Sequence, residues 1–173
     1  MTPYREMALN NAWANATLYA ALSGLDDAAF AAPRPGFFPS LLATMNHIHA
    51  VDLYYIDAVE EGGLGRAVYD RAEVALPAEL GAMQAETDAR LARFCAGLGA
   101  ARAQDRVRTE RAHAPRATER IDRLLLHLFQ HQIHHRGQAH VQLQHAGIAP
   151  PQLDEFYLDD DRALSARSYW TET

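Results

Sequence analysis

The sequence predicts an all-α protein, a four-helix bundle. Four long segments repeat apolar residues at helical spacing, and strand signals are almost absent between them. Glycine and proline stand at the ends of these segments, as they do at helix boundaries. Four helices of about 20–30 residues in a chain of this length are typical of a four-helix bundle. We therefore expect residues 1–173 to form one four-helix-bundle domain.

The first three helices are expected at residues 3–23, 40–61 and 77–98. Gly24 ends the first helix, and Gly62 and Gly63 end the second. Pro77 opens the third, because proline is favoured in the first helical turn. Each segment carries apolar residues every three or four positions, which predicts one face turned to the core.

The fourth helix is expected at residues 118–146, after a polar and irregular stretch from 99 to 116. Gly147 closes this helix, and Pro150 and Pro151 follow it. The tail from residue 152 to 173 is mixed in character. Its aromatic side chains are expected to pack back onto the bundle: Phe156, Tyr157, Tyr169 and Trp170.

Charge and composition exclude several function classes. The net charge is −6 and no basic run is present, so we expect no nucleic-acid partner. No segment has the apolar length of a transmembrane helix, and the N-terminus lacks the layout of a signal peptide, so we expect a cytoplasmic protein without membrane contact. The single cysteine, Cys95, excludes an internal disulfide and lies in an apolar helical pattern that predicts burial.

Four histidines stand close together in the fourth helix: His127, His131, His134 and His135. Residues four apart lie on one helix face, so His131 and His135 can share a metal ion, and His127 extends their line by one turn. Such a pair is often only a solvated face. Here leucines and phenylalanine surround it, and an unpaired buried polar group costs about 1–3 kcal/mol. We interpret the pair as half of a transition-metal site.

The second helix offers the third ligand. His47 shares its face with mostly small residues, which leave space for a ligand, whereas His49 points away from it and is expected to be a surface or packing residue. The remaining histidines do not fit the same site, because they lie in a loop, on the opposite face or too far along the helix: His113, His140 and His145.

These residues closely resemble the DinB-like (YfiT-like) metalloenzyme family. Residues 127–138 resemble the signature of its fourth helix, and residues 38–48 with Asp52 resemble its second-helix motif. Residues 11–15 and 150–157 resemble its N-terminal and C-terminal motifs. The resemblance implies an up-down-down-up bundle, often dimeric, with His47, His131 and His135 as metal ligands. It also implies activity as a thiol-dependent S-transferase, or as a thiol-dependent isomerase.

We therefore expect one divalent transition metal, Zn²⁺ or Ni²⁺ first, with Fe²⁺ or Mn²⁺ as alternatives. The expected function is a metal-dependent S-transferase that joins a low-molecular-weight thiol to a small-molecule substrate. The alternatives are a metal-dependent hydrolase and a non-catalytic metal-binding stress protein. A general base is not evident in the sequence, and catalytic residues beyond the metal site stay unassigned.

Several further residues are candidates for the surroundings of the metal. His127 is a candidate extra ligand, and His134 a neighbour that can hydrogen-bond nearby. Gln138 and Tyr54 suit hydrogen bonding to a ligand, or simply form a polar rim. Trp13 is a core residue or a wall of the pocket.

Two expectations concern packing. Asp52 and Arg136 lie away from the ligand faces, and we expect an ion pair between them that braces the two ligand helices. The fourth helix is apolar on both sides, with Leu126, Phe129 and Ile133 opposite the histidines. Either loops and tail wrap this far side, or it meets a second subunit, and the family resemblance favours a homodimer.

Overall fold

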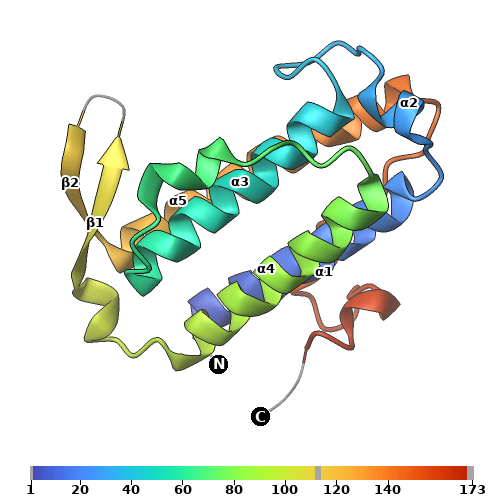
Figure 1. The fold of residues 1–173 in the computed structure, drawn as a ribbon. Coiled ribbons are helices and arrows are strands. Elements are labelled where there is room, and N and C mark those ends of the chain that lie inside the picture. The colour runs from blue at the N-terminus through green and yellow to red at the C-terminus, as the bar shows by residue number, and fades with distance from the viewer. Residues whose placement is uncertain (1, 112–113, 171–173) are drawn as a thin grey trace.

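The computed structural model describes residues 2–111 and 114–170, and this part is mainly helical, as the sequence predicts. Four long helices correspond to the four predicted segments, and a short α2 follows the first (Figure 1). Their bounds are α1 Pro3–Leu22, α2 Asp27–Ala31, α3 Leu41–Glu60, α4 Pro77–Gly97 and α5 Ile121–His145. Short 3₁₀ helices lie between or after them: η1 Gly65–Asp70, η2 Arg102–Gln104 and η3 Leu164–Ala166. No helix in the described ranges is long and apolar enough to cross a membrane.

Side-chain caps define where the first and third helices begin. The Thr2 hydroxyl accepts a hydrogen bond from the Arg5 backbone N–H at 3.3 Å, and Pro3 follows at the first helical position. The Ser40 hydroxyl accepts from the Ala43 backbone N–H at 3.1 Å. These caps satisfy backbone donors that have no partner within the helix. The start of α3 determines the register at which His47 faces its neighbours.

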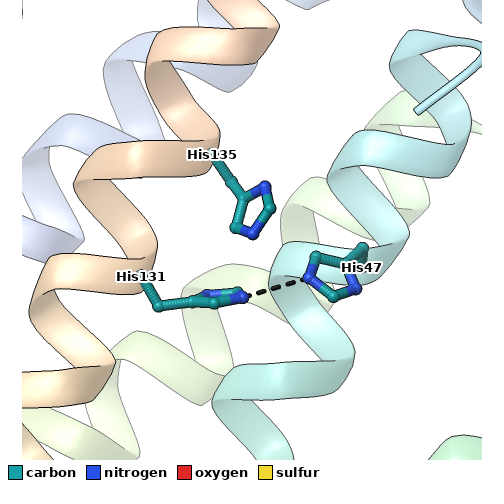
Figure 2. A group of neighbouring side chains, drawn as sticks. All are labelled: His47, His131 and His135. Atoms are coloured by element: carbon teal, nitrogen blue, oxygen red, sulfur yellow. Dashed lines mark hydrogen bonds between the residues drawn. The ribbon is translucent and has the colours of Figure 1, made fainter. Parts of the chain in front are cut away.

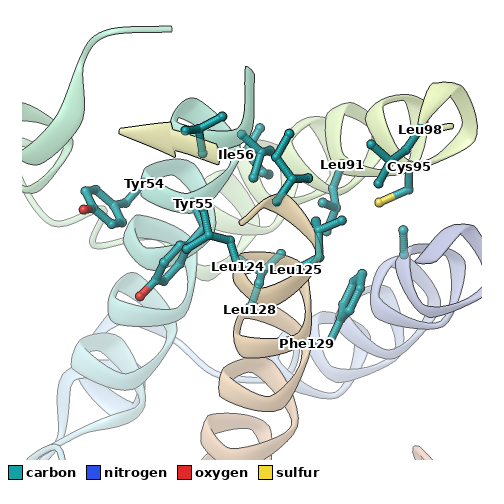
Figure 3. Packing of buried hydrophobic residues seen from close by; sticks show 14 of the residues in the cluster. Tyr54, Tyr55, Ile56, Leu91, Cys95, Leu98, Leu124, Leu125, Leu128 and Phe129 are labelled. Carbon is teal, nitrogen blue, oxygen red and sulfur yellow. The ribbon is translucent and has the colours of Figure 1, made fainter. Parts of the chain in front are cut away.

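The long helices pack in two pairs, α1 with α4 and α3 with α5 (Figure 1). Further contacts of α3 with α4 and of α1 with α5 join the pairs. A cluster of leucines on α5 fills the space towards α3 and α4, with Leu124, Leu125 and Leu128 all buried (Figure 3). Cys95 is completely buried in the same cluster, which confirms that it is a core residue.

A β-hairpin occupies the stretch that we expected to be irregular. Strands β1 (Arg106–Arg111) and β2 (Ala114–Arg120) pair antiparallel, with a register shift near the tip between Thr109 and Arg111. Because β2 runs to Arg120, α5 begins at Ile121 rather than at residue 118. Val107 and Thr109 alternate inwards and are buried, and this short period-two pattern is the signal that the sequence reading overlooked.

The C-terminal tail packs against α1, as expected. Trp13 on α1 is buried against Phe156, with ring centroids 5.7 Å apart, and its indole N–H donates to the Ser165 hydroxyl at 3.0 Å. The Arg162 guanidinium lies 4.0 Å from the centre of the Trp170 ring. Trp13 is therefore anchored to the tail.

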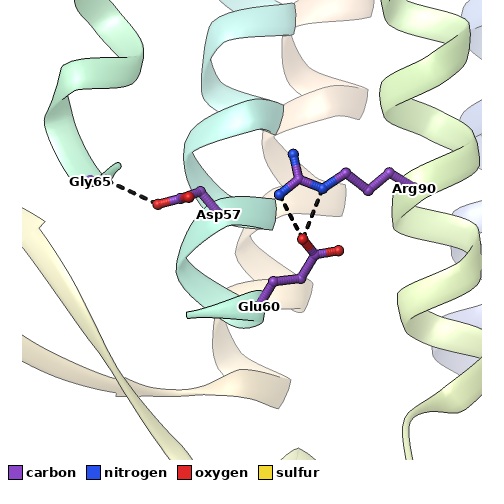
Figure 4. A network of polar contacts seen from close by, with 4 residues as sticks. All are labelled: Asp57, Glu60, Gly65 and Arg90. Atoms are coloured by element: carbon purple, nitrogen blue, oxygen red, sulfur yellow. Dashed lines mark hydrogen bonds and ion pairs between the residues drawn. The ribbon is translucent and has the colours of Figure 1, made fainter. Parts of the chain in front are cut away.

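Polar contacts fix the end of α3 (Figure 4). Arg90 on α4 donates through Nε and Nη2 to one Glu60 carboxylate oxygen, at 2.8 and 2.6 Å. The Asp57 carboxylate accepts from the Gly65 backbone N–H at 2.9 Å, which holds the turn into η1. These contacts tie α3 to α4 and to the loop that follows α3.

Candidate metal centre

Three histidines from two helices meet between α3 and α5. His131 and His135 project from successive turns of α5, and His47 projects from α3 (Figure 2). Each offers one ligand atom, and these atoms all lie within 4.8 Å of one another. The Nε2 atoms of His47 and His131 are 3.0 Å apart, and the rings of His131 and His135 are separated by 4.2 Å between centroids. Within residues 2–111 and 114–170, no other group of His, Cys, Asp and Glu converges in this way.

The spacing of the ring nitrogens suits a metal ion. Zinc binds histidine nitrogen at about 2.0–2.1 Å, so two ligands of a tetrahedral site lie about 3.3 Å apart. The observed 3.0 Å between His47 and His131 is close to that value. Three imidazoles are the ligand set of catalytic zinc sites that keep a fourth position open. The residues present therefore fit a divalent transition metal.

Burial keeps these imidazoles neutral. Desolvation, helped by the charge of His135, lowers the pKa of His47 to about 4. The same causes, with further neighbouring histidines, lower the pKa of His131 to about 3, and burial also lowers that of His135. A neutral imidazole has a free lone pair, whereas a protonated one cannot bind metal. At neutral pH the three imidazoles are therefore in the protonation state that could hold a metal ion.

Gln138 orients His135. The Nδ1–H of His135 donates to the Gln138 side-chain oxygen at 2.8 Å, so the other ring nitrogen, Nε2, is the one left for a metal. The Gln138 amide donates in turn to Nε2 of His134 at 3.1 Å. A hydrogen-bonded partner of this kind fixes the tautomer and the ring direction of a ligand. Gln138 and His134 thus support the centre from outside.

Phenylalanine covers one end of the centre. The Phe38 ring lies 4.5 Å from the His47 ring and 5.6 Å from that of His135, between centroids. Gln142 on α5 holds this segment, because its amide donates to the Phe38 carbonyl at 2.8 Å and its oxygen accepts from the Thr44 hydroxyl at 2.7 Å. Phe37 beside it is 76% exposed. The apolar rings reduce access of water at this end.

Three predicted neighbours lie outside the ligand group. His127 is exposed, with its ring 6.3 Å from that of His131 and 5.1 Å from that of Tyr55. The Tyr54 hydroxyl donates to the Glu110 carbonyl at 2.5 Å and accepts from the Glu110 N–H at 2.9 Å, so Tyr54 anchors the hairpin. Trp13 packs with the tail rather than at the metal pocket.

The other histidines are placed largely as expected. His49 is buried and its Nε2 donates to the Thr87 hydroxyl at 3.2 Å, because that hydroxyl itself donates to a backbone carbonyl. His49 is therefore a packing residue. His140 and His145 do not join the triplet, and His113 falls outside the described residues.

Comparison with known families is decisive for classification. The DinB family profile matches residues 1–165 of this 173-residue chain. The chain belongs to the DinB family. The matched region contains α3 and α5 and the tail as far as residue 165, which includes Phe156. No curated protein matches the chain.

A network of buried polar side chains lies beside the candidate metal centre of this DinB protein. It differs from the ion pair that we expected between Asp52 and Arg136. Asp52 and Arg136 form no direct ion pair in the described structure. Instead Gln132 bridges them: its amide donates to the Asp52 carboxylate, and its oxygen accepts from Arg136 at 3.4 Å. Because Gln132 is adjacent to His131 in sequence, the network connects directly to a ligand turn of α5.

The network continues onto α1 and α4. Arg136 donates to the side-chain oxygens of Asn11 and Asn15, at 2.6 and 3.0 Å, and both amides donate to Asp88 at 3.0 Å. Gln84 donates to Asp88 at 3.0 Å and to Asp52 at 2.8 Å. All four long helices of the DinB domain are thus joined by buried polar side chains.

Burial changes the charges of this network. Desolvation raises the pKa of Asp52 to about 8 and that of Asp88 to about 6, and it lowers the pKa of Arg136 to about 10. Apolar periodicity did not point to Gln84, Asp88 and Gln132. The available signal was polar residues four apart on otherwise buried faces, as in the pair Gln84 and Asp88.

Proposed function

We propose that this DinB-family protein is a metal-dependent S-transferase. In this proposal His47, His131 and His135 bind one divalent transition metal, Zn²⁺ or Ni²⁺, and the reaction joins a low-molecular-weight thiol to a small electrophilic molecule. A divalent ion held by three neutral imidazoles acts as a Lewis acid that lowers the pKa of a bound thiol. The sulfur forms a bond to carbon, the thiol proton goes to solvent, and the leaving group departs with the electrons of its broken bond.

The observation that carries this proposal is the composition of the ligand group. It contains three histidines and, among the described residues, no carboxylate or cysteine. Three neutral ligands leave the full charge of the ion and an open position for an exogenous group. The only cysteine, Cys95, is completely buried, and burial raises the pKa of its thiol to about 12. The nucleophilic thiol must therefore come from outside the protein.

Space for a small molecule adjoins the centre. A cleft of about 480 Å³ lies beside α3, and its lining includes Phe38, His47, Tyr69 and Met83. Phe38 shields the histidines, and Gln138 holds His135 in its ligating orientation. These residues position and shield the reactants, and proton transfer to solvent needs no further side chain.

Cobalt substitution tests the proposal directly. Untagged protein should contain about one equivalent of metal. After replacement by Co²⁺, a small thiol such as 2-mercaptoethanol should give a sulfur-to-metal charge-transfer band. The band should vanish in His135→Ala and persist in His145→Ala, which alters an exposed histidine of the same helix.

Each remaining outcome selects a different function. Turnover of esters or amides without any thiol band would replace the transferase by a hydrolase in which water takes the place of the thiol. Tight metal binding with neither a thiol band nor turnover would leave a non-catalytic metal-binding protein. Protein that takes up no metal would contradict the whole proposal.

The same proposal covers architecture and assembly. We infer an up-down-down-up order of the four long helices in one domain that includes the whole chain, and a homodimer formed through the outer side of α5. Leu126 and Ile133 are 50% and 56% exposed there, so the described loops and tail leave about half of each side chain open. Phe129 is buried within the core instead. An exposed apolar stripe on a helix is typical of a subunit interface.

A further inference from the structure

Arg111 is a cation held in place by Tyr55 of α3. Its Nη1 donates to the Tyr55 hydroxyl at 2.7 Å, and its guanidinium carbon lies 5.5 Å from the centre of the Tyr55 ring. Among the described residues it forms no ion pair with a carboxylate. Arg111 is half-buried at the end of β1. A fixed guanidinium has several donors in a planar fork, which matches an oxyanion.

A row of rings joins this cation to the ligand histidines. The Tyr55 ring lies 5.1 Å from the His127 ring, and His127 lies 6.3 Å from His131, one turn further along α5. Figure 3 shows the hydroxyls of Tyr54 and Tyr55 pointing away from the leucine cluster of α5. Exposed His127 is thus the side chain between Arg111 and the candidate metal centre.

Aromatic rings also connect Tyr55, the partner of Arg111, to the cleft beside His47. Tyr69 lines that cleft and stacks on Tyr54 at 5.4 Å, and Tyr54 in turn meets Tyr55 at 5.1 Å. Burial lowers the pKa of His127, and the Arg111 charge adds to this shift. The same charge opposes the burial that raises the pKa of Tyr69. Both groups therefore lie within its field. The contacts of Tyr55 with Tyr54 and of Tyr54 with Tyr69 thus connect the side chain that holds Arg111 to the lining of the cleft.

We propose that Arg111 and His127 form an oxyanion-binding subsite for a carboxylate carried by the thiol that reaches the metal centre. The guanidinium supplies the positive charge, and neutral His127 supplies a ring N–H donor. Charge-assisted hydrogen bonds of this kind are about twice as strong as neutral ones. The inference rests on the proposed function and adds that the preferred thiol molecule also carries a carboxylate group.

Matched thiols test the subsite in cobalt-substituted protein. The probes are ω-mercaptocarboxylates of three to eleven carbons, each paired with the mercaptoalcohol of equal length, and binding is followed by the charge-transfer band. For at least one length the acid should bind about tenfold more tightly than the alcohol, equivalent to about 1.4 kcal/mol. Arg111→Gln should abolish this preference, and Arg111→Lys should retain part of it. His127→Phe should reduce it while keeping the ring contact with Tyr55.

Arg108→Gln is the matched control, because Arg108 is exposed on the same strand and the change in net charge is identical. Its preference for the acid should equal that of the unmodified protein. Equal losses in Arg108→Gln and Arg111→Gln would show a diffuse effect of net charge and overturn the proposal. Equal binding of acid and alcohol at every length would also overturn it.

A separate measurement isolates the subsite from the proposed function. If no thiol binds the metal, the S-transferase proposal fails, and the metal-loaded protein is titrated with glutarate instead. The NMR signal of the Arg111 Nε–H, assigned by its loss in Arg111→Gln, is the readout. A saturable shift with glutarate but not with chloride would support the subsite. An unmoved signal would overturn it.

Discussion

The three histidines of the candidate metal centre occupy three separate helix positions, so each can be replaced by alanine without changing the other two. We expect His47→Ala, His131→Ala and His135→Ala to lose bound metal, because two imidazoles do not complete a stable shell. Metal analysis after gel filtration is the measurement, and His145→Ala, on the exposed side of α5, should keep its metal. Full metal content in any one of the three variants would remove that histidine from the ligand set.

Gln138 is predicted to act through His135. We expect Gln138→Met to weaken metal affinity about 10–100-fold, because the His135 ring loses the acceptor that fixes its tautomer. Competition with a chromophoric chelator measures the change. Gln144→Met replaces an exposed glutamine of the same helix and should bind as the unmodified protein does. Equal affinity in the two variants would mean that Gln138 plays no part in orienting the ligand.

The pH dependence of metal binding follows from the lowered pKa values. Protons compete with metal only when the imidazoles can be protonated, at a pKa of about 4 for His47 and about 3 for His131. Metal should therefore be retained through the usual histidine range near pH 6.5 and lost cooperatively as pH falls towards those values. Dialysis over a pH series checks this. Full retention at about pH 3 would indicate ligands other than histidine.

At the scale of helices, the buried network makes stability depend on pH. Burial raises the pKa of Asp52 from 3.8 to about 8, so between these values the folded chain keeps a proton that the unfolded chain releases. The contribution of Asp52 to the free energy of unfolding is therefore complete below its unfolded pKa of 3.8. This contribution is lost as pH rises towards 8, by at most about 1.4 kcal/mol per pH unit.

Asp52→Asn keeps the shape of the side chain but replaces the carboxyl group by an amide that cannot titrate. We expect the metal-free variant to lose less stability than the unmodified protein as pH rises from about 5 to about 8. Denaturant unfolding of both proteins gives the comparison, and Asp70→Asn, at an exposed site, should follow the unmodified protein. Parallel curves for Asp52→Asn and the unmodified protein would show that Asp52 does not hold a proton in the folded state.

The hairpin shows where reading one element at a time is insufficient. Its strands carry many arginines and little apolar surface, so periodicity gives a weak signal. What holds β1 in place is distant in sequence: Tyr54 on α3 hydrogen-bonds both backbone groups of Glu110. Arg111 follows Glu110 in the strand, so the contact of Glu110 with Tyr54 also places Arg111 beside Tyr55. The proposed subsite therefore exists only because α3 and β1 meet.

At the scale of the whole molecule, the exposed apolar residues on the outer side of α5 predict a homodimer. We expect Ile133→Glu to shift a homodimer to monomer, because a charge on an apolar interface loses its solvation without gaining a partner. Light scattering at about micromolar concentration, in the range of common protein dimers, gives the mass. Leu164→Glu changes a side chain that is 77% exposed away from α5 and should remain dimeric. A monomeric unmodified protein would contradict the proposed dimer.

The sequence by itself determined the four long helices to within a few residues, the core position of Cys95 and the shared face of His131 and His135. These depend on spacing within a few residues, and helical periodicity reports such spacing reliably. The small residues on the face of His47 suggested it as the third ligand, and the family resemblance implied the same residue. The structure brings His47 to His131 across 84 positions of sequence.

Only the tertiary structure decided the contacts between elements. It replaced the expected ion pair of Asp52 and Arg136 by a bridge through Gln132, and it placed Trp13 and Tyr54 away from the centre. It also set Arg111 beside Tyr55. Helical spacing tells which side chains share a face, but partners on different elements are chosen by packing and by the need to satisfy every buried polar group. That choice is made by the whole chain at once.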